Sequence, residues 1–151
     1  MTDATLSGLI DRVEGATGPD REIDRALASL AGPRHFSVGL ELEELAEGRE
    51  RELSETTDFW CVTVLHASGG SANGGYRKIT DSIEAGFNLI EDLLPNTLRC
   101  VGTMEDGPFC RLVVPDGNGG YINGAISANA NTEPLAIILA LLRALQSKPS
   151  P

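Results

Sequence analysis

One stretch constrains the fold of this chain more than any other. Residues 129–145 contain an uninterrupted apolar run from Leu135 to Leu142, preceded by Thr132, which can cap a helix, and by Pro134, which fits a first helical turn. A helix that is apolar on every side has to be covered on every side. Because a bilayer span needs roughly 20 apolar residues, this run is too short to cross a membrane. The sequence therefore predicts a core helix of a soluble domain, with a sheet and a further layer packed on it.

Three further helices are predicted from the spacing of apolar residues. Residues 5–15 carry leucine, isoleucine and valine at helical spacing. A second helix is expected to run from the turn at residues 17–20 to Gly32. A third, capped by Thr80, is expected to end before Pro95, which cannot continue it.

Strands are predicted where apolar residues alternate or where β-branched and aromatic residues cluster. These segments are residues 36–42, 59–65, 98–104, 109–114 and 121–128. Asp106-Gly107 is a typical hairpin turn, so the last three strands are expected to form an antiparallel meander. Residues 44–58 and 67–75 are expected to be loops or insertions, because they are polar or rich in glycine and serine. For residues 46–58 the alternative is an exposed hairpin arm.

The order of these elements predicts an α+β fold with a mostly antiparallel sheet, in a single domain spanning residues 1–151. The later strands are apolar on both faces, since Cys110 and Leu112 alternate with Phe109 and Val113. A sheet of this kind is normally buried on both sides. Helices are therefore expected on both faces, in an α/β/α sandwich-like arrangement, unless a second copy of the chain covers one face.

The net charge of −10 disfavours general binding to DNA or RNA, because a polyphosphate would be repelled. A small anionic ligand remains compatible, since it needs only a few converging cationic groups. The N-terminal residues lack the basic and apolar regions of a secretion signal. Cys61, Cys100 and Cys110 have no CxxC spacing and lie in apolar segments, so inert buried thiols in a reducing cytoplasm are expected.

The sequence contains no recognisable motif for catalysis, for a metal or for a cofactor. His35 and His66 lie far apart without metal-type neighbours, so structural or solvent-facing roles are expected unless folding brings them together. The Gly-rich residues 117–120 precede a strand, whereas a phosphate loop needs a helix N-terminus. A binding protein without a cofactor is therefore expected. The enzymatic alternative is a nucleotide phosphodiesterase with both histidines in one pocket.

Cationic residues are few, so those within apolar strands are candidates for ligand binding. Arg99 and Arg111 each need an anionic partner, which is either an internal carboxylate such as Glu91 or Asp92, or a ligand phosphate. A two-residue hairpin loop would point these arginines to opposite faces of the sheet, and a three-residue loop to the same face. Phe109 offers a ring that either stacks on a base or packs in the core.

Four more side chains complete the candidate set. Arg143, near the end of the last helix, is either an ordinary cation at a helix C-terminus or a ligand contact. Asn123 and Asn131, like the nearby Asn129, offer amides that either read a base edge or phosphate or cap local turns. The predicted ligand-binding residues are thus Arg34, Arg99, Phe109, Arg111, Asn123, Asn131 and Arg143.

Three segments together resemble a known family. Residues 9–24, 79–86 and 130–144 are similar, in this order, to phage-encoded proteins with the phage ABA sandwich domain. Residues 32–75 depart from that pattern. The family often carries an arginine where this chain has Leu139, whereas Arg143 matches a second arginine of the pattern.

The resemblance implies a function. Some proteins of this kind resemble the anti-Thoeris sponge proteins of phages, which bind cyclic ADP-ribose-type signals or cyclic oligonucleotides without cleaving them. Such proteins form symmetric oligomers with pockets between subunits. By this resemblance, the chain is expected to sequester a cyclic nucleotide immune signal in the host bacterial cytoplasm, as a homo-oligomer between a dimer and a hexamer. The alternatives are an acidic module that blocks a host protein through residues 41–55, and another structural role in the phage.

Overall fold

The computed structural model describes residues 3–31, 50–56, 58–66, 70–122 and 124–147. Contacts within the chain gather in two compact units: a first unit of residues 1–19 and 80–151, and a second unit of residues 20–79. Each unit contains a three-stranded antiparallel sheet and at least one helix. The predicted α+β class is confirmed. The sequence predicts a single domain. In the structure, the described strands form two separate sheets, and the contacts within the chain form two compact units.

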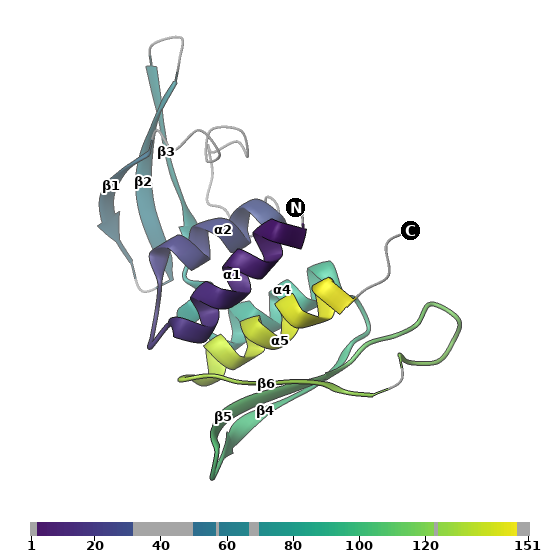
Figure 1. Ribbon diagram of the computed structural model, residues 1–151. Helices are drawn as coiled ribbons and strands as arrows, with labels where there is room; N and C mark the ends of the chain where they lie inside the picture. Colours follow the sequence, from purple (N-terminus) through teal and green to yellow (C-terminus); the bar gives the residue numbers. More distant parts are fainter. Residues whose placement is uncertain (1–2, 32–49, 57, 67–69, 123, 148–151) are drawn as a thin grey trace. The chain divides into compact units, whose positions relative to one another are not determined.

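The first unit contains three helices and one sheet (Figure 1). Its helices are α1 (Asp3–Gly15), α4 (Ile83–Leu93) and α5 (Glu133–Ser147). Its sheet has the order β4-β5-β6, with strands Leu98–Met104, Gly107–Val113 and Ile126–Asn129. Figure 1 shows α4 and α5 on the same side of this sheet.

Helix α5 is the centre of the first unit. It contacts all three strands as well as α1 and α4, and every residue from Leu135 to Leu142 is buried as a result. The Leu135 N–H donates to Thr132 Oγ1 at 3.3 Å, which confirms the predicted cap. Fully burying one leucine or isoleucine contributes about 1.5–3 kcal/mol, so α5 supplies much of this unit's stability. No described helix, α5 included, is long and apolar enough to span a bilayer.

The turn between β4 and β5 decides which side chains share a face of the sheet. Met104 pairs with Gly107, so the turn has two residues, and Gly107 adopts a φ of +100° that suits glycine. The predicted hairpin is therefore confirmed. With this loop length, Arg99 and Arg111 point to opposite faces of the sheet.

The two faces of the sheet β4-β5-β6 have different surroundings. Cys110, Leu112 and Ala128 are buried on the face that packs against α5, which we call the inner face. The outer face is exposed in the first unit, and its apolar side chains Leu98 and Met104 are 54% and 69% exposed. The remaining polar and aromatic side chains of the outer face are Cys100, Phe109, Arg111, Ser127 and Asn129.

The second unit contains α2 (Arg21–Ala31) and a sheet of order β1-β2-β3, with strands Glu50–Glu55, Phe59–His66 and Gly70–Arg77. The predicted loop at residues 67–75 is therefore wrong where β3 forms. In the segment 44–58, β1 pairs antiparallel with β2, as in the hairpin-arm alternative and not as in a loop. The apolar strand β2 needs partners on both edges, and backbone hydrogen bonds pair it with polar and Gly-rich segments regardless of their side chains. The strand predicted at residues 36–42 lies outside the described residues.

A buried polar contact ties α2 to β2 within the second unit. Trp60 Nε1 donates to Asp24 Oδ2 at 2.8 Å, and Asp24 is fully buried. The Lys78 ammonium lies 4.5 Å from the centre of the Trp60 ring. On β3, a Cβ at Gly75 would lie 2.1 Å from the Trp60 carbonyl oxygen, so only glycine fits there.

Two element boundaries differ from the predictions. Thr80 is buried in a short 3-10 helix, η2 (Ile79–Asp81), and does not cap α4. Ser82 is the cap instead, because its side chain accepts from the Ala85 N–H at 3.1 Å. The last strand of the meander runs from Ile126 to Asn129 rather than over residues 121–128. Before it, Asp116 accepts backbone N–H groups of the Gly-rich turn, and Tyr121 forms only an isolated bridge with Pro115.

Replacing Gly86 by alanine is expected to destabilise the protein by about 1–3 kcal/mol, because a Cβ there would lie 2.8 Å from Ile137 Cγ2. Ile137 is fully buried and β-branched, so it has little freedom to move. Gly8 in α1 is the matched control, since nothing lies within 4 Å of a Cβ there and alanine should stabilise the helix by up to about 1 kcal/mol. Urea unfolding followed by circular dichroism measures both. Equal stabilisation by the two substitutions would contradict the close packing of α4 on α5.

Candidate ligand-binding site

Three of the predicted site residues are engaged inside the first unit. The Arg99 guanidinium lies 4.7 Å from the centre of the Phe87 ring and 3.8 Å from Glu91, the internal carboxylate considered above. Arg143 donates to the Ser127 carbonyl at 3.1 Å and lies 3.5 Å from Glu14. These contacts explain both arginines as parts of the fold.

Asn131 also has a structural contact. Its Nδ2 donates to the Ala16 carbonyl at 2.6 Å, which ties the start of α5 to the end of α1. Arg34 and Asn123 lie outside the described residues.

Phe109 and Arg111 are the two predicted residues that the structure brings together. They are two positions apart on β5 and therefore share the outer face. There they line a concavity of about 480 Å³, within the range of ordinary ligand sites. Its lining side chains are Met104, Glu105, Asp106, Phe109, Arg111, Ser127 and Asn129.

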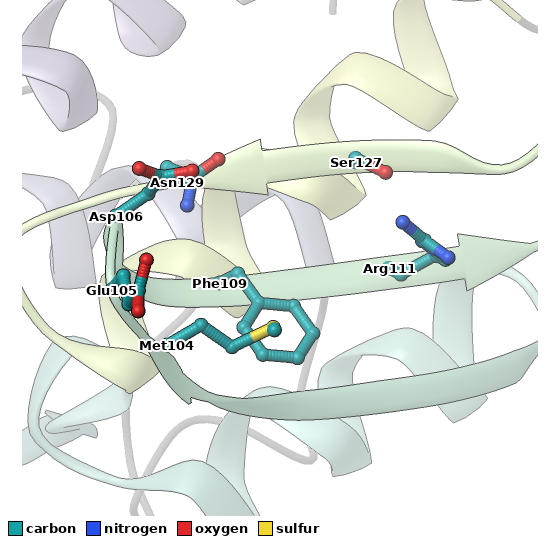
Figure 2. A pocket seen from close by; sticks show the side chains of 7 residues that line it. All are labelled: Met104, Glu105, Asp106, Phe109, Arg111, Ser127 and Asn129. Carbon is teal, nitrogen blue, oxygen red and sulfur yellow. The ribbon is translucent and has the colours of Figure 1, made fainter.

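The concavity has two chemically different ends (Figure 2). Arg111 and Ser127 lie at one end, and Glu105, Asp106 and Asn129 lie at the other, near the hairpin turn. Between them lie the Phe109 ring and the Met104 side chain. We call these the cationic end and the turn end.

The Arg111 side chain is available to a ligand. It is exposed, and its guanidinium makes no hydrogen bond or ion pair with any residue in the described part of the chain. Arg111 lies across from Cys100 on β4 and from Ser127 on β6, neither of which carries a negative charge. A guanidinium fork placed in this way can bind a phosphate or carboxylate through two N–H groups.

The Phe109 ring has room to lie on the sheet because its cross-strand partner has no side chain. Phe109 pairs with Gly102, and a Cβ there would lie 3.1 Å from ring atom Cε1. The ring is half-buried and lines the concavity. Flat aromatic surface of this kind is suited to stacking on a nucleobase, and such stacking is worth about 1–3 kcal/mol.

The described residues contain no group of three or more His, Cys, Asp and Glu side chains placed to hold a metal ion. His35 lies outside the described residues, and His66 is the last residue of β2. Of the side chains that line the concavity, Arg111 can bind an anion, Phe109 can stack on an aromatic ring, and the polar side chains can form hydrogen bonds with the edge of a base.

The cysteines differ more than the sequence predicts. Cys110 is fully buried on the inner face, and burial, together with the neighbouring Cys100 thiol, raises its pKa from 9.0 to about 12. Cys100 is exposed, because it lies on the outer face of an edge strand, so its predicted burial is wrong. Cys61 is partly buried.

We expect iodoacetamide to alkylate Cys100 readily at pH 8 and to leave Cys110 unmodified until the protein unfolds. Peptide mass spectrometry measures each site separately. The pKa of Cys110 also predicts a loss of stability in alkali. The unfolded chain loses this proton near pH 9 and the folded chain near pH 12, so stability is full below pH 9 and falls as pH rises between these values.

The slope from this thiol is at most about 1.4 kcal/mol per pH unit. The Cys110→Ala variant should lack this contribution to the slope of stability against pH. The variant should nevertheless be less stable than the original protein at neutral pH. Identical alkaline slopes in the two proteins would show that the thiol is not kept protonated by burial.

No family model, no curated protein and no solved structure matches this chain. The resemblance to the phage ABA sandwich domain therefore stays a prediction.

Four of the lining residues are absent from the candidates that the sequence offers: Met104, Glu105, Asp106 and Ser127. Asn129 is among the amides considered from the sequence but not in the final predicted set. A signal for them exists in the sequence. Once the hairpin signalled by Asp106-Gly107 is given a loop of two residues, alternation along β4 and β5 places Met104 and Phe109 on the same face as Arg111. The position of β6 could not be obtained in this way, because that strand is four residues long and follows a long turn.

Proposed function

We propose that the protein binds a small cyclic nucleotide on the outer face of the sheet β4-β5-β6 and holds it without cleaving it. In this proposal it is a phage anti-defence protein that withholds an immune signal in the cytoplasm of the host bacterium. The nature of the signal and the biological setting rest on the family resemblance. The charge and the aromatic ring of the site are compatible with a ligand of this kind.

The observation that carries the proposal is the combination, in one concavity, of an aromatic ring and a guanidinium without a hydrogen-bonding or ionic partner among the described residues. Arg111 can bind a phosphate through charge-assisted hydrogen bonds, and Phe109 can stack on a base. Both side chains lie on the same strand, β5, of a sheet, which lowers the ordering cost of binding. Retention needs no acid, base or nucleophile.

The test is recovery of an intact ligand. The purified protein is mixed with cyclic ADP-ribose or a cyclic dinucleotide, separated from unbound ligand by gel filtration, and heat-denatured. Mass spectrometry of the released fraction should show the ligand unchanged. Recovery of a hydrolysed product would indicate an enzyme, and the absence of any retained nucleotide would refute the proposal.

We also propose that the protein is a homo-oligomer in which a second copy covers part of the outer face. Leu98 and Met104 support this, since both are large apolar side chains exposed on that face. Leu98 lies outside the concavity, so Leu98→Lys should favour the monomer while leaving the lining residues in place. Mass photometry of the two proteins measures the change, and an unchanged distribution would argue against this interface.

A further inference from the structure

The turn end of the concavity is rich in hydrogen-bond acceptors. Glu105 and Asp106 have ionised carboxylates that accept hydrogen bonds and cannot donate them. Asn129 adds an amide, whose Nδ2 already lies 3.4 Å from the Pro108 carbonyl oxygen, while no described residue donates to its carbonyl oxygen. This end therefore favours a ligand group that donates hydrogen bonds and disfavours one that only accepts them.

The cationic end imposes the opposite preference. Arg111 presents N–H donors and a positive charge, so the anionic part of a ligand belongs there. Glu105 and Asp106 repel the same anion from the turn end. A bound nucleotide is thus oriented by charge alone, with its phosphate towards Arg111 and its base towards the hairpin turn.

The order of side chains along the sheet agrees with this orientation. Phe109 lies between the two ends in Figure 2, where the plane of a base would lie if its phosphate reached Arg111. Arg111 lies four positions after Gly107 on β5, which is about 13 Å along an extended strand. A nucleotide has its base edge and its phosphate at opposite ends, as this site requires.

From these contacts we infer that the site selects nucleotides whose base carries an exocyclic amine, as adenine and cytosine do, over their keto counterparts. This inference rests on the proposed nucleotide-binding function. The amine of adenine or cytosine donates hydrogen bonds to Glu105 or Asp106, as a carboxylate accepts from the cytosine amine in protein–DNA complexes. Hypoxanthine and uracil place a carbonyl oxygen at that position and carry a donor N–H only on the neighbouring ring nitrogen. With the base held in the same place by Phe109 and Arg111, two acceptors face each other, and the unpaired carboxylate loses part of its hydration without compensation.

The test compares two matched pairs of probes. Binding of 3′,5′-cyclic AMP is compared with that of 3′,5′-cyclic IMP, and 3′,5′-cyclic CMP with 3′,5′-cyclic UMP, by ligand-detected NMR titration. Within each pair the sugar and phosphate are the same. We expect the amine-bearing nucleotide to bind about 5–30-fold more tightly, the range that one hydrogen bond to a charged group gives.

The variant Glu105→Gln/Asp106→Asn decides whether these carboxylates cause the preference. Its amides both donate and accept, so the ratio within each pair should fall close to one. Removing two negative charges should also strengthen binding of all four phosphates, but this effect is common to both members of a pair. The control Asp11→Asn/Glu84→Gln removes the same charge at exposed positions of α1 and α4, and should keep the wild-type ratio.

Each outcome has one meaning. Equal binding within the pairs, or a preference that survives Glu105→Gln/Asp106→Asn, overturns the inference and leaves nucleotide binding intact. Failure of all four nucleotides to bind at millimolar concentration overturns the inference, and the proposed function fails with it if cyclic ADP-ribose and a cyclic dinucleotide are not retained either.

Discussion

Replacing Arg111 by alanine is expected to weaken nucleotide binding about 10- to 100-fold. Arg111 supplies the positive charge at one end of the concavity, and hydrogen bonds from a charged group are worth about 1.5–3 kcal/mol. Its guanidinium has no partner in the described part of the chain, so the substitution leaves no internal carboxylate unpaired. Isothermal titration calorimetry or ligand-detected NMR with the retained nucleotide measures the change.

The matched control is Arg99→Ala, on the neighbouring strand of the same hairpin. It removes the same charge but lies on the inner face, where Arg99 contacts Phe87 and Glu91. We expect a modest loss of stability and nearly unchanged affinity. If both substitutions weaken binding equally, then only the overall charge matters and the assignment of the outer face is wrong.

Two further substitutions separate charge from geometry. Arg111→Lys keeps the charge and loses the planar fork, so an intermediate affinity is expected if the phosphate is held by two parallel N–H groups. Phe109→Ala should cost about 1–3 kcal/mol of binding if a base stacks on the ring. Gly102→Ala tests the same contact indirectly, because the added Cβ would lie 3.1 Å from the ring and displace it.

Parts of this fold were predictable because local chemistry determines them. The cap at Thr132 and the apolar run of α5 required a buried helix, and Asp106-Gly107 required a tight hairpin. By contrast, β1 and β3 have polar or Gly-rich sequences and exist as strands through backbone pairing with β2. Such pairing is not encoded in the side chains of the segments themselves.

The same distinction applies to the candidate site. Phe109 and Arg111 share a face because of strand periodicity, which any strand prediction contains. The partner of Arg143 could not be found in this way, because Glu14 is distant in the sequence and approaches only when α1 packs on α5. Asn131 is a similar case, since its partner is the Ala16 carbonyl. Three-dimensional packing thus decides which of the predicted residues have a structural role, as Arg99, Arg143 and Asn131 do, and which can contact a ligand, as Arg111 can.

Leu139→Ala is expected to destabilise the protein by about 2–5 kcal/mol, the largest change in stability that we predict for one residue. Leu139 is fully buried in α5, in the middle of the run that the sheet and two helices cover. The loss combines the transfer free energy of the removed atoms with the cost of the cavity left behind. Chemical denaturation monitored by circular dichroism measures it.

Leu98→Ala, measured at a protein concentration low enough for the monomer, is the matched control, because it removes the same atoms from a side chain that is 54% exposed within one chain. We expect its effect to stay within about 1 kcal/mol, since surface changes leave no cavity. Leu139→Met, which conserves volume, should cost less than about 1.5 kcal/mol. Similar losses for Leu139→Ala and Leu98→Ala would show that α5 is not enclosed as described.

The environment of Leu139 also bears on where a ligand can bind. The family pattern that this chain resembles often has an arginine at this position, and in this protein such a guanidinium would be surrounded by apolar side chains. An unpaired buried charge costs several kcal/mol, so Leu139→Arg should lower stability at least as much as Leu139→Ala. A stable Leu139→Arg protein with stronger nucleotide binding would instead place the ligand beside α5, away from Arg111. Binding at the outer face predicts the reverse result: a destabilised protein, with no gain in affinity while it remains folded.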